Sequence, residues 1–180
     1  MRHHRTNNMN VMIGALLVIA TLLAVGCSQQ SPMSSNDESS QPRLLSRSMS
    51  SGAASLSPAE LYTEARVSSA EGGVLSLIDV VLEVPAGAVP NDTLFSIAIP
   101  DPNVFFNEFG THGLVFDVPV TVTMSYRDAD LSGIDESTIR LGWFDPDTGE
   151  MHDMVCEVDY VTKTVTGQLN HFSAYGLISD

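Results

Sequence analysis

Residues 114–126 read LVFDVPVTVTMSY, and this stretch decides the fold. Apolar side chains fall on every second position, beginning with Leu114, Phe116 and Val118, while polar residues or proline occupy most of the positions between them. A period of two over this length predicts a β-strand with one buried face and one solvent-facing face. Pro119 has no amide hydrogen to donate to a neighbouring strand, so we expect an edge, a bulge or a break at this point.

Further runs of β-forming residues lie on both sides of this stretch, at 74–77, 80–84, 93–99, 139–144, 151–158, 165–171 and 174–178. Turn residues separate them, among them the Pro-Ala-Gly sequence at 85–87 and the Asp-Pro-Asp-Thr-Gly sequence at 145–149. Many short strands without a long helical pattern predict an all-β fold, an antiparallel β-sandwich. We expect this domain to span residues 67–180.

The N-terminus has the features of a secretory signal. Arg2 and Arg5 precede residues 11–25, which carry no charged side chain, and small residues lead up to Cys27. The apolar run is shorter than the ~20 residues of an ordinary membrane-spanning helix. The junction resembles the lipobox of bacterial lipoproteins, although Ala24 stands where that family most often has leucine. The resemblance implies removal of residues 1–26 and lipidation of Cys27 on its thiol, with an uncleaved anchor or plain secretion as the alternatives.

This resemblance implies a place in the bacterial cell envelope, anchored by lipid and facing the periplasm or the exterior. Ser28 follows Cys27, and the absence of aspartate there is compatible with outer-membrane sorting in a Gram-negative cell. With Cys27 lipidated, Cys156 is the only remaining cysteine, so we expect no intramolecular disulfide.

Charge narrows the choice of partners. The chain has 22 acidic and 8 basic residues and a formal net charge of −14, and the signal would remove Arg2 and Arg5 but no acidic residue. Nucleic acid is therefore not an expected partner, because binding phosphates requires clustered lysine and arginine. Anionic lipid headgroups would repel the domain as well, so we expect its attachment to the membrane to depend on the lipid.

Residues 28–57 contain 12 serines and no apolar periodicity. This composition predicts a tether, and we assign residues 27–66 to the lipidated N-terminus and this tether. Ser57, Pro58 and Glu60 fit a helix N-cap, a proline in the first turn and a capping-box glutamate, so the sequence also predicts a short helix over residues 58–65.

Four segments in order resemble the ZU-five family, named for zonula occludens proteins and netrin receptors and also present in ankyrins. They read EGGV at 71–74, VVLEVPAGAV at 80–89, GLVFDVPVTVT at 113–123 and HFSAY at 171–175. The resemblance covers about residues 67–180 and implies a β-sandwich. Physical reasons support the same positions, because Gly72 and Gly73 permit a positive φ at a strand start, and Pro85 with Gly87 ends a strand and turns the chain.

The His171-Phe172-Ser173 triplet is the candidate catalytic site. In an extended strand, positions i and i+2 share a face, so His171 and Ser173 would flank the peptide bond between Phe172 and Ser173. Self-cleaving ZU-five domains are cut at this bond, so the resemblance implies His171 as the base and Ser173 as the nucleophile. The hydroxyl would attack the Phe172 carbonyl, and water would hydrolyse the resulting ester.

The same triplet also fits a buried C-terminal strand, which is the structural alternative. One face of such a strand would carry Val165, Gly167, Leu169, His171, Ser173, Tyr175 and Leu177. His171 would then be a half-buried, hydrogen-bonded residue, and Phe172 would point to the second face.

Two acidic loops offer oxygen ligands for calcium. The first copies the start of an EF-hand loop at Asp128, Asp130, Ser132 and Gly133. It departs from that pattern at Asp135, where an apolar residue is required, and at Ile139, where glutamate is required. The second, residues 145–150, has the composition that a tight hairpin needs in any case. Solvated hairpin loops are the simpler interpretation of both.

We therefore expect a lipid-anchored extracytoplasmic β-sandwich that acts as a non-enzymatic binding or structural module. Its partner would be an unidentified protein or surface polymer, and we expect no cofactor and no metal; the histidines at 112, 152 and 171 lack the spacing of zinc ligands. The alternatives are a self-processing domain that cleaves the Phe172–Ser173 bond and a calcium-stabilised surface module. A conventional enzyme is less favoured, because a single sandwich without insertions has no enclosing cleft.

Overall fold

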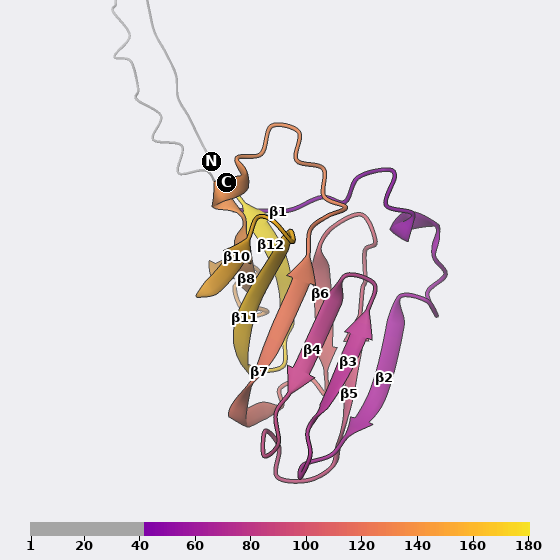
Figure 1. Ribbon diagram of the computed structural model, residues 1–180, viewed down its shortest axis with the longest axis vertical. Helices are drawn as coiled ribbons and strands as arrows, with labels where there is room; N and C mark the ends of the chain where they lie inside the picture. The colour runs from indigo at the N-terminus through magenta and orange to yellow at the C-terminus, as the bar shows by residue number, and fades with distance from the viewer. Residues whose placement is uncertain (1–41) are drawn as a thin grey trace, which may run out of the picture. The chain divides into compact units, whose positions relative to one another are not determined.

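A computed structural model of the protein describes residues 42–180 (Figure 1). The predicted signal at 1–26, the candidate lipidation site Cys27 and the first part of the predicted tether lie outside the described residues. Within residues 42–180 no helix is long and apolar enough to cross a membrane.

Two antiparallel sheets pack against each other, which confirms the predicted β-sandwich. The seven-stranded sheet consists of β1 (Arg43–Leu44), β2 (Tyr62–Val67), β5 (Thr93–Ala98), β6 (Phe106–Gly110), β8 (Arg140–Phe144), β9 (Met151–Asp153) and β12 (Ala174–Ser179). The five-stranded sheet consists of β3 (Gly73–Leu77), β4 (Val80–Val84), β7 (Val115–Ser125), β10 (Cys156–Asp159) and β11 (Thr164–His171). Two short 3₁₀ turns, Ala53–Ser55 and Glu136–Thr138, complete the regular structure.

The order of strands in the first sheet is β2-β5-β6-β12-β8-β9, and β1 pairs with β12. The order in the second is β10-β11-β7-β4-β3. Six of the ten neighbouring pairs therefore join strands that are not consecutive in the sequence, and Figure 1 shows the strands running along the length of the domain.

Strand β7 behaves largely as its sequence predicts. Phe116, Val120, Val122 and Met124 are buried, but Val118 is 40% exposed. The reason is a bulge: Leu169 of β11 pairs with Val120, whereas His171 pairs with Val115, so the register shifts across the intervening part of β7. Pro119 lies in this part of the strand, and its predicted interruption is confirmed.

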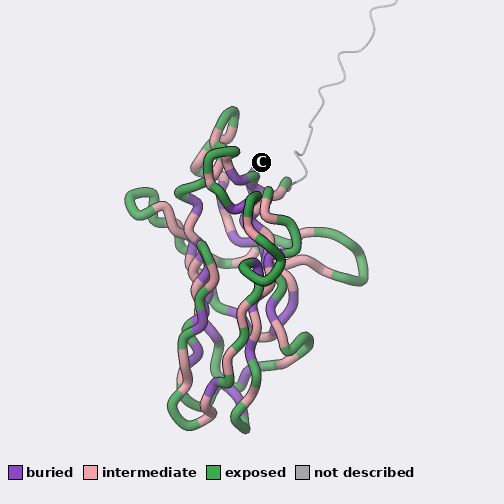
Figure 2. Tube along the Cα trace, turned by 90° about the vertical axis from the view of Figure 1, so that its right-hand side faces the viewer, coloured by how far each residue is buried: buried purple, intermediate pink, exposed green. Residues whose placement is uncertain are grey.

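The core between the sheets contains an aromatic cluster of Phe95, Phe109, Phe116 and Phe172. The Phe172 ring packs edge-on against Phe95 and Phe116, with centroids 4.7 and 4.8 Å apart, and lies 5.9 Å from Phe109. Buried positions alternate with more exposed ones along the strands in Figure 2. The two sheets are thus held together by residues that the period-two pattern directs inward.

The predicted helix over residues 58–65 is wrong. Glu60 does accept hydrogen bonds from the Ser57 amide and hydroxyl, at 2.9 and 2.7 Å, as a capping box would. However, these contacts close a turn, and β2 begins at Tyr62. All six residues of β2 pair with β5, and this long-range pairing overrides the local helix signal.

The sandwich also begins earlier than predicted. Strand β1 lies before Val67 and β2 ends at it, and both Leu45 and Arg47 are buried, so residues 43–66 belong to the domain and not to a tether. Leu44 and Leu45 are adjacent and are followed by serines and Arg47, a pattern without apolar periodicity.

Two predicted strands are divided between the sheets. The run at 151–158 forms β9 in one sheet and β10 in the other. The single C-terminal strand proposed as the alternative for the His171 triplet is also absent, because β11 ends at His171 in the five-stranded sheet and β12 begins at Ala174 in the seven-stranded sheet. The chain crosses between the layers at Phe172 and Ser173, which places the Phe172 ring in the core.

Gly72 shows why glycine opens the β3 hairpin. Its φ is +75°, and a Cβ at this position would lie 2.1 Å from the Val84 carbonyl oxygen. Any other residue would therefore clash with the end of β4 as well as strain the backbone. The predicted positive φ is thus confirmed at Gly72, whereas Gly73 is the first residue of β3 and has no positive φ.

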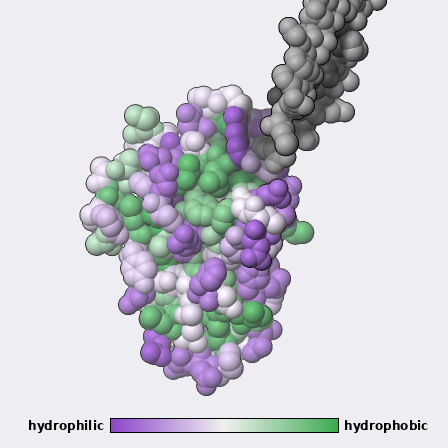
Figure 3. All heavy atoms as spheres, turned by 180° about the vertical axis from the view of Figure 1, so that it is seen from behind, coloured by the Kyte–Doolittle hydropathy of each residue, from purple (hydrophilic) through white to green (hydrophobic). Residues whose placement is uncertain are grey.

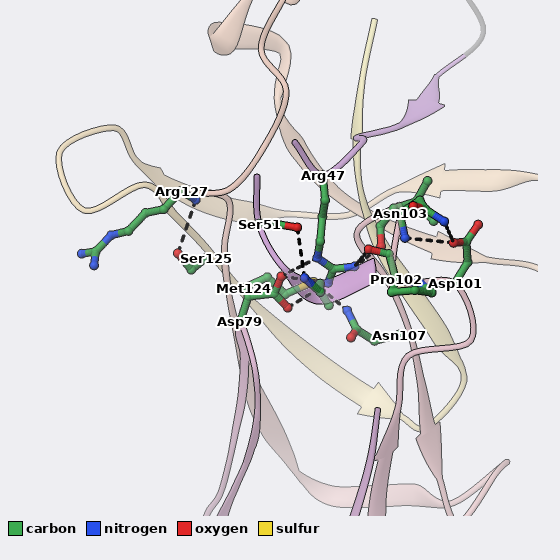
Figure 4. Close-up of polar contacts among 12 residues, drawn as sticks. Arg47, Ser51, Asp79, Asp101, Pro102, Asn103, Asn107, Met124, Ser125 and Arg127 are labelled. Atoms are coloured by element: carbon green, nitrogen blue, oxygen red, sulfur yellow. Dashed lines mark hydrogen bonds and ion pairs between the residues drawn. The ribbon is translucent and has the colours of Figure 1, made fainter. Parts of the chain in front are cut away.

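A buried ion pair fastens the N-terminal segment to the sandwich (Figure 4). The Arg47 side chain donates to both carboxylate oxygens of Asp79, at 2.9 and 3.0 Å, and to the carbonyl oxygens of Pro102 and Val104. Its guanidinium lies 4.4 Å from the centre of the Phe105 ring. Arg47 thereby joins the β3–β4 turn of one sheet to the β5–β6 connection of the other.

Burial raises the pKa of the Asp79 carboxyl, and the charge of Arg47 offsets this only in part. The pair therefore fixes the N-terminal segment, the β3–β4 turn and the β5–β6 connection relative to one another. Its net electrostatic contribution to the free energy of folding is small, as is common for buried ion pairs.

Replacing Arg47 by alanine should lower the free energy of unfolding by about 3–5 kcal/mol, because Asp79 would remain buried without its partner. Urea denaturation measures this loss. Arg127→Ala is the matched control, since the Arg127 side chain is exposed and among the described residues donates one hydrogen bond, to the Thr162 carbonyl oxygen, and we expect a loss of less than about 1 kcal/mol. Equal stabilities of the two variants would contradict the structural role of the ion pair.

Candidate binding site

One row of side chains runs across five strands of the seven-stranded sheet. The pairing registers place five residues directly beside one another, in the order Tyr62, Ala98, Glu108, Ala174 and Phe144. All five lie on the outer face, because their neighbours along the strands, such as Ile97, Phe109 and Tyr175, point into the core. The row thus has an aromatic residue at each end, a glutamate at its centre and small residues between.

This row forms the floor and walls of a hollow of about 520 Å³, which we call the trough. Its lining comprises the five residues of the row together with Ser96, Phe109, Gly110, His112, Pro146 and Ser173. The hollow is open to solvent, and it extends from the edge strand β2 to the β8–β9 turn.

Small residues keep the trough open. Ser96 and Gly110 pair with each other in the row next to Ala98 and Glu108. A Cβ at Gly110 would come within 2.4 Å of the Ser96 hydroxyl oxygen, so these two positions cannot both carry larger side chains without rearrangement. Seen from behind (Figure 3), the molecule shows apolar side chains in its upper part and again near its lower end, with polar ones around them.

The trough is electrostatically negative. Glu108 is exposed, and within residues 42–180 it takes part in no side-chain hydrogen bond or ion pair. Glu64, in the row next to Tyr62, accepts a hydrogen bond of 2.6 Å from the Tyr62 hydroxyl, and this bond raises the pKa of Tyr62. No lysine or arginine belongs to the described lining.

The two predicted catalytic residues belong to different parts of the structure, because His171 ends β11 and Ser173 lies in the crossing to β12. The chain bends at Ser173, so His171 and Ser173 are not two positions of one extended strand. The hydroxyl of Tyr175 donates to the His171 carbonyl oxygen at 2.8 Å and lies 3.4 Å from the ring Nδ1 of His171. The ring of Trp143 packs edge-on against His171, with centroids 5.6 Å apart.

Ser173 is instead associated with the trough, where His112 is the histidine that shares its lining. No hydrogen bond joins Ser173 to either histidine among the described residues. The Gly113 amide donates to the Phe172 carbonyl oxygen at 3.1 Å, and the Phe109 amide donates to the Ser173 carbonyl oxygen at 3.0 Å. These contacts hold the crossing between the sheets in place.

Burial raises the pKa of Tyr175, so its hydroxyl remains a hydrogen-bond donor across the physiological pH range. The Tyr175 hydroxyl provides a hydrogen-bond donor for the His171 carbonyl oxygen at the end of β11. His171 therefore occupies a half-buried, hydrogen-bonded position, as the structural alternative expected, although the chain there is not one continuous strand.

The acidic loops use their carboxylates to close turns. Asp130 accepts from the Ser132 amide at 3.0 Å, and Asp145 accepts from the Asp147 amide at 2.9 Å. Within residues 42–180 there is no group of three or more histidine, cysteine or acidic side chains that could hold a metal ion. The Sγ of Cys156 accepts a hydrogen bond of 3.4 Å from the Leu141 amide, at a half-buried position.

The sequence did not predict the trough because two of the strands that form it, β2 and β6, were not among the predicted strands. In residues 105–110, FFNEFG, the buried positions are Phe105, Asn107 and Phe109, while Glu108 points outward. Phe106 and the buried Asn107 interrupt the expected alternation of apolar and polar residues. The regular spacing of the two buried phenylalanines around an outward glutamate was the available signal.

No model of a known protein family matches this chain, and no curated protein matches it either. The resemblances to lipoproteins and to the ZU-five family therefore stay predictions.

We expect the Phe172–Ser173 bond to remain intact, because His171 is hydrogen-bonded to Tyr175 and is not placed to take the Ser173 proton. Intact mass spectrometry of the denatured protein should give a single full-length mass, and the Ser173→Ala variant should differ only by the mass of the missing oxygen. Two fragments that meet at this bond, absent from the alanine variant, would show that the domain processes itself.

Proposed function

We propose that this protein is a lipid-anchored extracytoplasmic β-sandwich that acts as a non-enzymatic binding module. Cys27 would carry the lipid, and the trough would be the surface that meets the partner. The observation that carries the proposal is the in-register row from Tyr62 to Phe144, which builds an open hollow with aromatic ends on an uncovered sheet face.

Binding is favoured over catalysis for a structural reason. A hydrolytic site needs a nucleophile or a water held by a base within hydrogen-bond distance. Among the described lining residues, neither Ser173 nor Glu108 forms such a side-chain contact with His112. Aromatic residues at the two ends of a concave surface are instead typical of recognition sites.

The lipid anchor can be tested by changing Cys27 to serine. The wild-type protein should partition with the membrane fraction and incorporate labelled palmitate. Cys27→Ser should lose both properties because it lacks the thiol that accepts the lipid. Cys156→Ser is the matched control and should behave like the wild-type protein. Unchanged membrane partition of Cys27→Ser would contradict this mode of attachment.

The trough can be tested by photo-crosslinking in cells. Tyr62 and Tyr160 are tyrosines of similar exposure, 45% and 48%, but only Tyr62 lines the trough. A benzoylphenylalanine at Tyr62 should give a discrete adduct of higher mass, and the same residue at Tyr160 should not. Equal labelling from both positions, or none from Tyr62, would contradict the trough as the binding surface.

A further inference from the structure

We propose that the trough binds a lysine or arginine side chain of a basic partner polypeptide, with Glu108 as the counter-ion and the ring of either Tyr62 or Phe144 beside its aliphatic stem. This inference rests on the proposed function and names the chemistry of the partner.

The geometry of the row suits one long cationic side chain. Glu108 lies two strands from Tyr62 and two strands from Phe144, which corresponds to about 10 Å on each side. Only Ala98 and Ala174 fill the space between. A methylene chain can lie over either alanine and against an aromatic ring while its charged end reaches the carboxylate.

The carboxylate of Glu108 is available for such a contact. Glu64 is engaged by the Tyr62 hydroxyl, whereas Glu108 has no side-chain partner among the described residues. Hydrogen bonds that involve a charged group are stronger than neutral ones.

The charge of the protein itself argues against two other occupants. Several of its basic side chains are already used inside the domain: Arg47 pairs with Asp79, Arg140 with Asp153 and Asp180, and Lys163 with Glu136. A second copy, with 22 acidic and 8 basic residues, would be repelled. The segment 28–41 contains no lysine or arginine, so it cannot supply the cation.

Charge complementarity therefore points to a basic polypeptide. An anionic polymer would meet the same repulsion as a second copy. A neutral oligosaccharide would use the aromatic rings but would leave the charge of Glu108 without a partner, so we treat it as the competing outcome of the test.

The test uses the purified full chain in a non-ionic detergent and a peptide that carries fluorescein on its N-terminal amine, fluorescein-Ala-Lys-Ala-Lys-Ala-amide, followed by fluorescence anisotropy. We expect saturable binding that weakens as salt is added, because the contact is a partly exposed ion pair. The same peptide with both lysines acetylated keeps the stems but loses the charge, and its affinity should be at least tenfold lower.

Two variants locate the contact. Glu108→Gln should weaken binding of the lysine peptide about tenfold, and Ala98→Leu should weaken it by filling the trough while Glu108 is retained. Glu83→Gln is the matched control, because Glu83 is an exposed strand glutamate on the outer face of the five-stranded sheet, and it should change the affinity less than twofold. Midpoints of urea denaturation equal to that of the wild-type protein would establish that the variants are folded.

Equal affinity for the acetylated peptide, or no effect of Glu108→Gln, would overturn the inference, as would binding of a neutral cello-oligosaccharide in place of the peptide. These results are distinguishable from failure of the proposed function. If crosslinking from Tyr62 persists while the peptide does not bind, the trough has a partner of different chemistry. If crosslinking fails as well, the proposed binding surface is wrong.

Discussion

Four phenylalanine rings set the arrangement on which the rest of the structure depends. Phe95 and Phe109 come from the seven-stranded sheet, Phe116 comes from β7, and Phe172 comes from the crossing between the sheets. Because alternate residues of a strand face opposite ways, burial of Phe95 and Phe109 directs their neighbours along β5 and β6, such as Ser96 and Glu108, to the outer face. The outer row with Glu108 at its centre is a direct consequence of this inner packing.

The crossing at Phe172 and Ser173 links the core to the outer face. The ring of Phe172 fills the core, while Ser173 belongs to the lining of the trough. Backbone hydrogen bonds from Gly113 and Phe109 hold the two carbonyl groups. Phe172 and Ser173, which suggested a catalytic site in the sequence, therefore have a structural role in joining the two sheets. Ser173 also forms part of the lining of the trough.

The N-terminal segment is part of this construction. Leu45 is buried beside β12, and Arg47 reaches across the end of the sandwich to Asp79. Desolvation of the buried Arg47–Asp79 pair costs free energy, and burial is the largest influence on the pKa of Asp79. The pair therefore serves mainly to fix the position of the N-terminal segment on the sandwich. If Cys27 carries a lipid, the domain would be joined to its anchor through a segment that is itself built into the sheet.

The sequence by itself determined the fold class, most of the strands and the interruption at Pro119, because period-two alternation and turn residues are local signals. Gly72 was likewise readable, since the need for a positive φ is a property of the residue and its turn. Tertiary structure alone decided that residues 43–66 join the sandwich, that 58–65 is not a helix, that His171 turns toward Tyr175, and that Glu108 stands between two alanines. Each of these depends on which strands pair and in which register, and pairing between residues far apart in the chain leaves no periodic trace in the sequence.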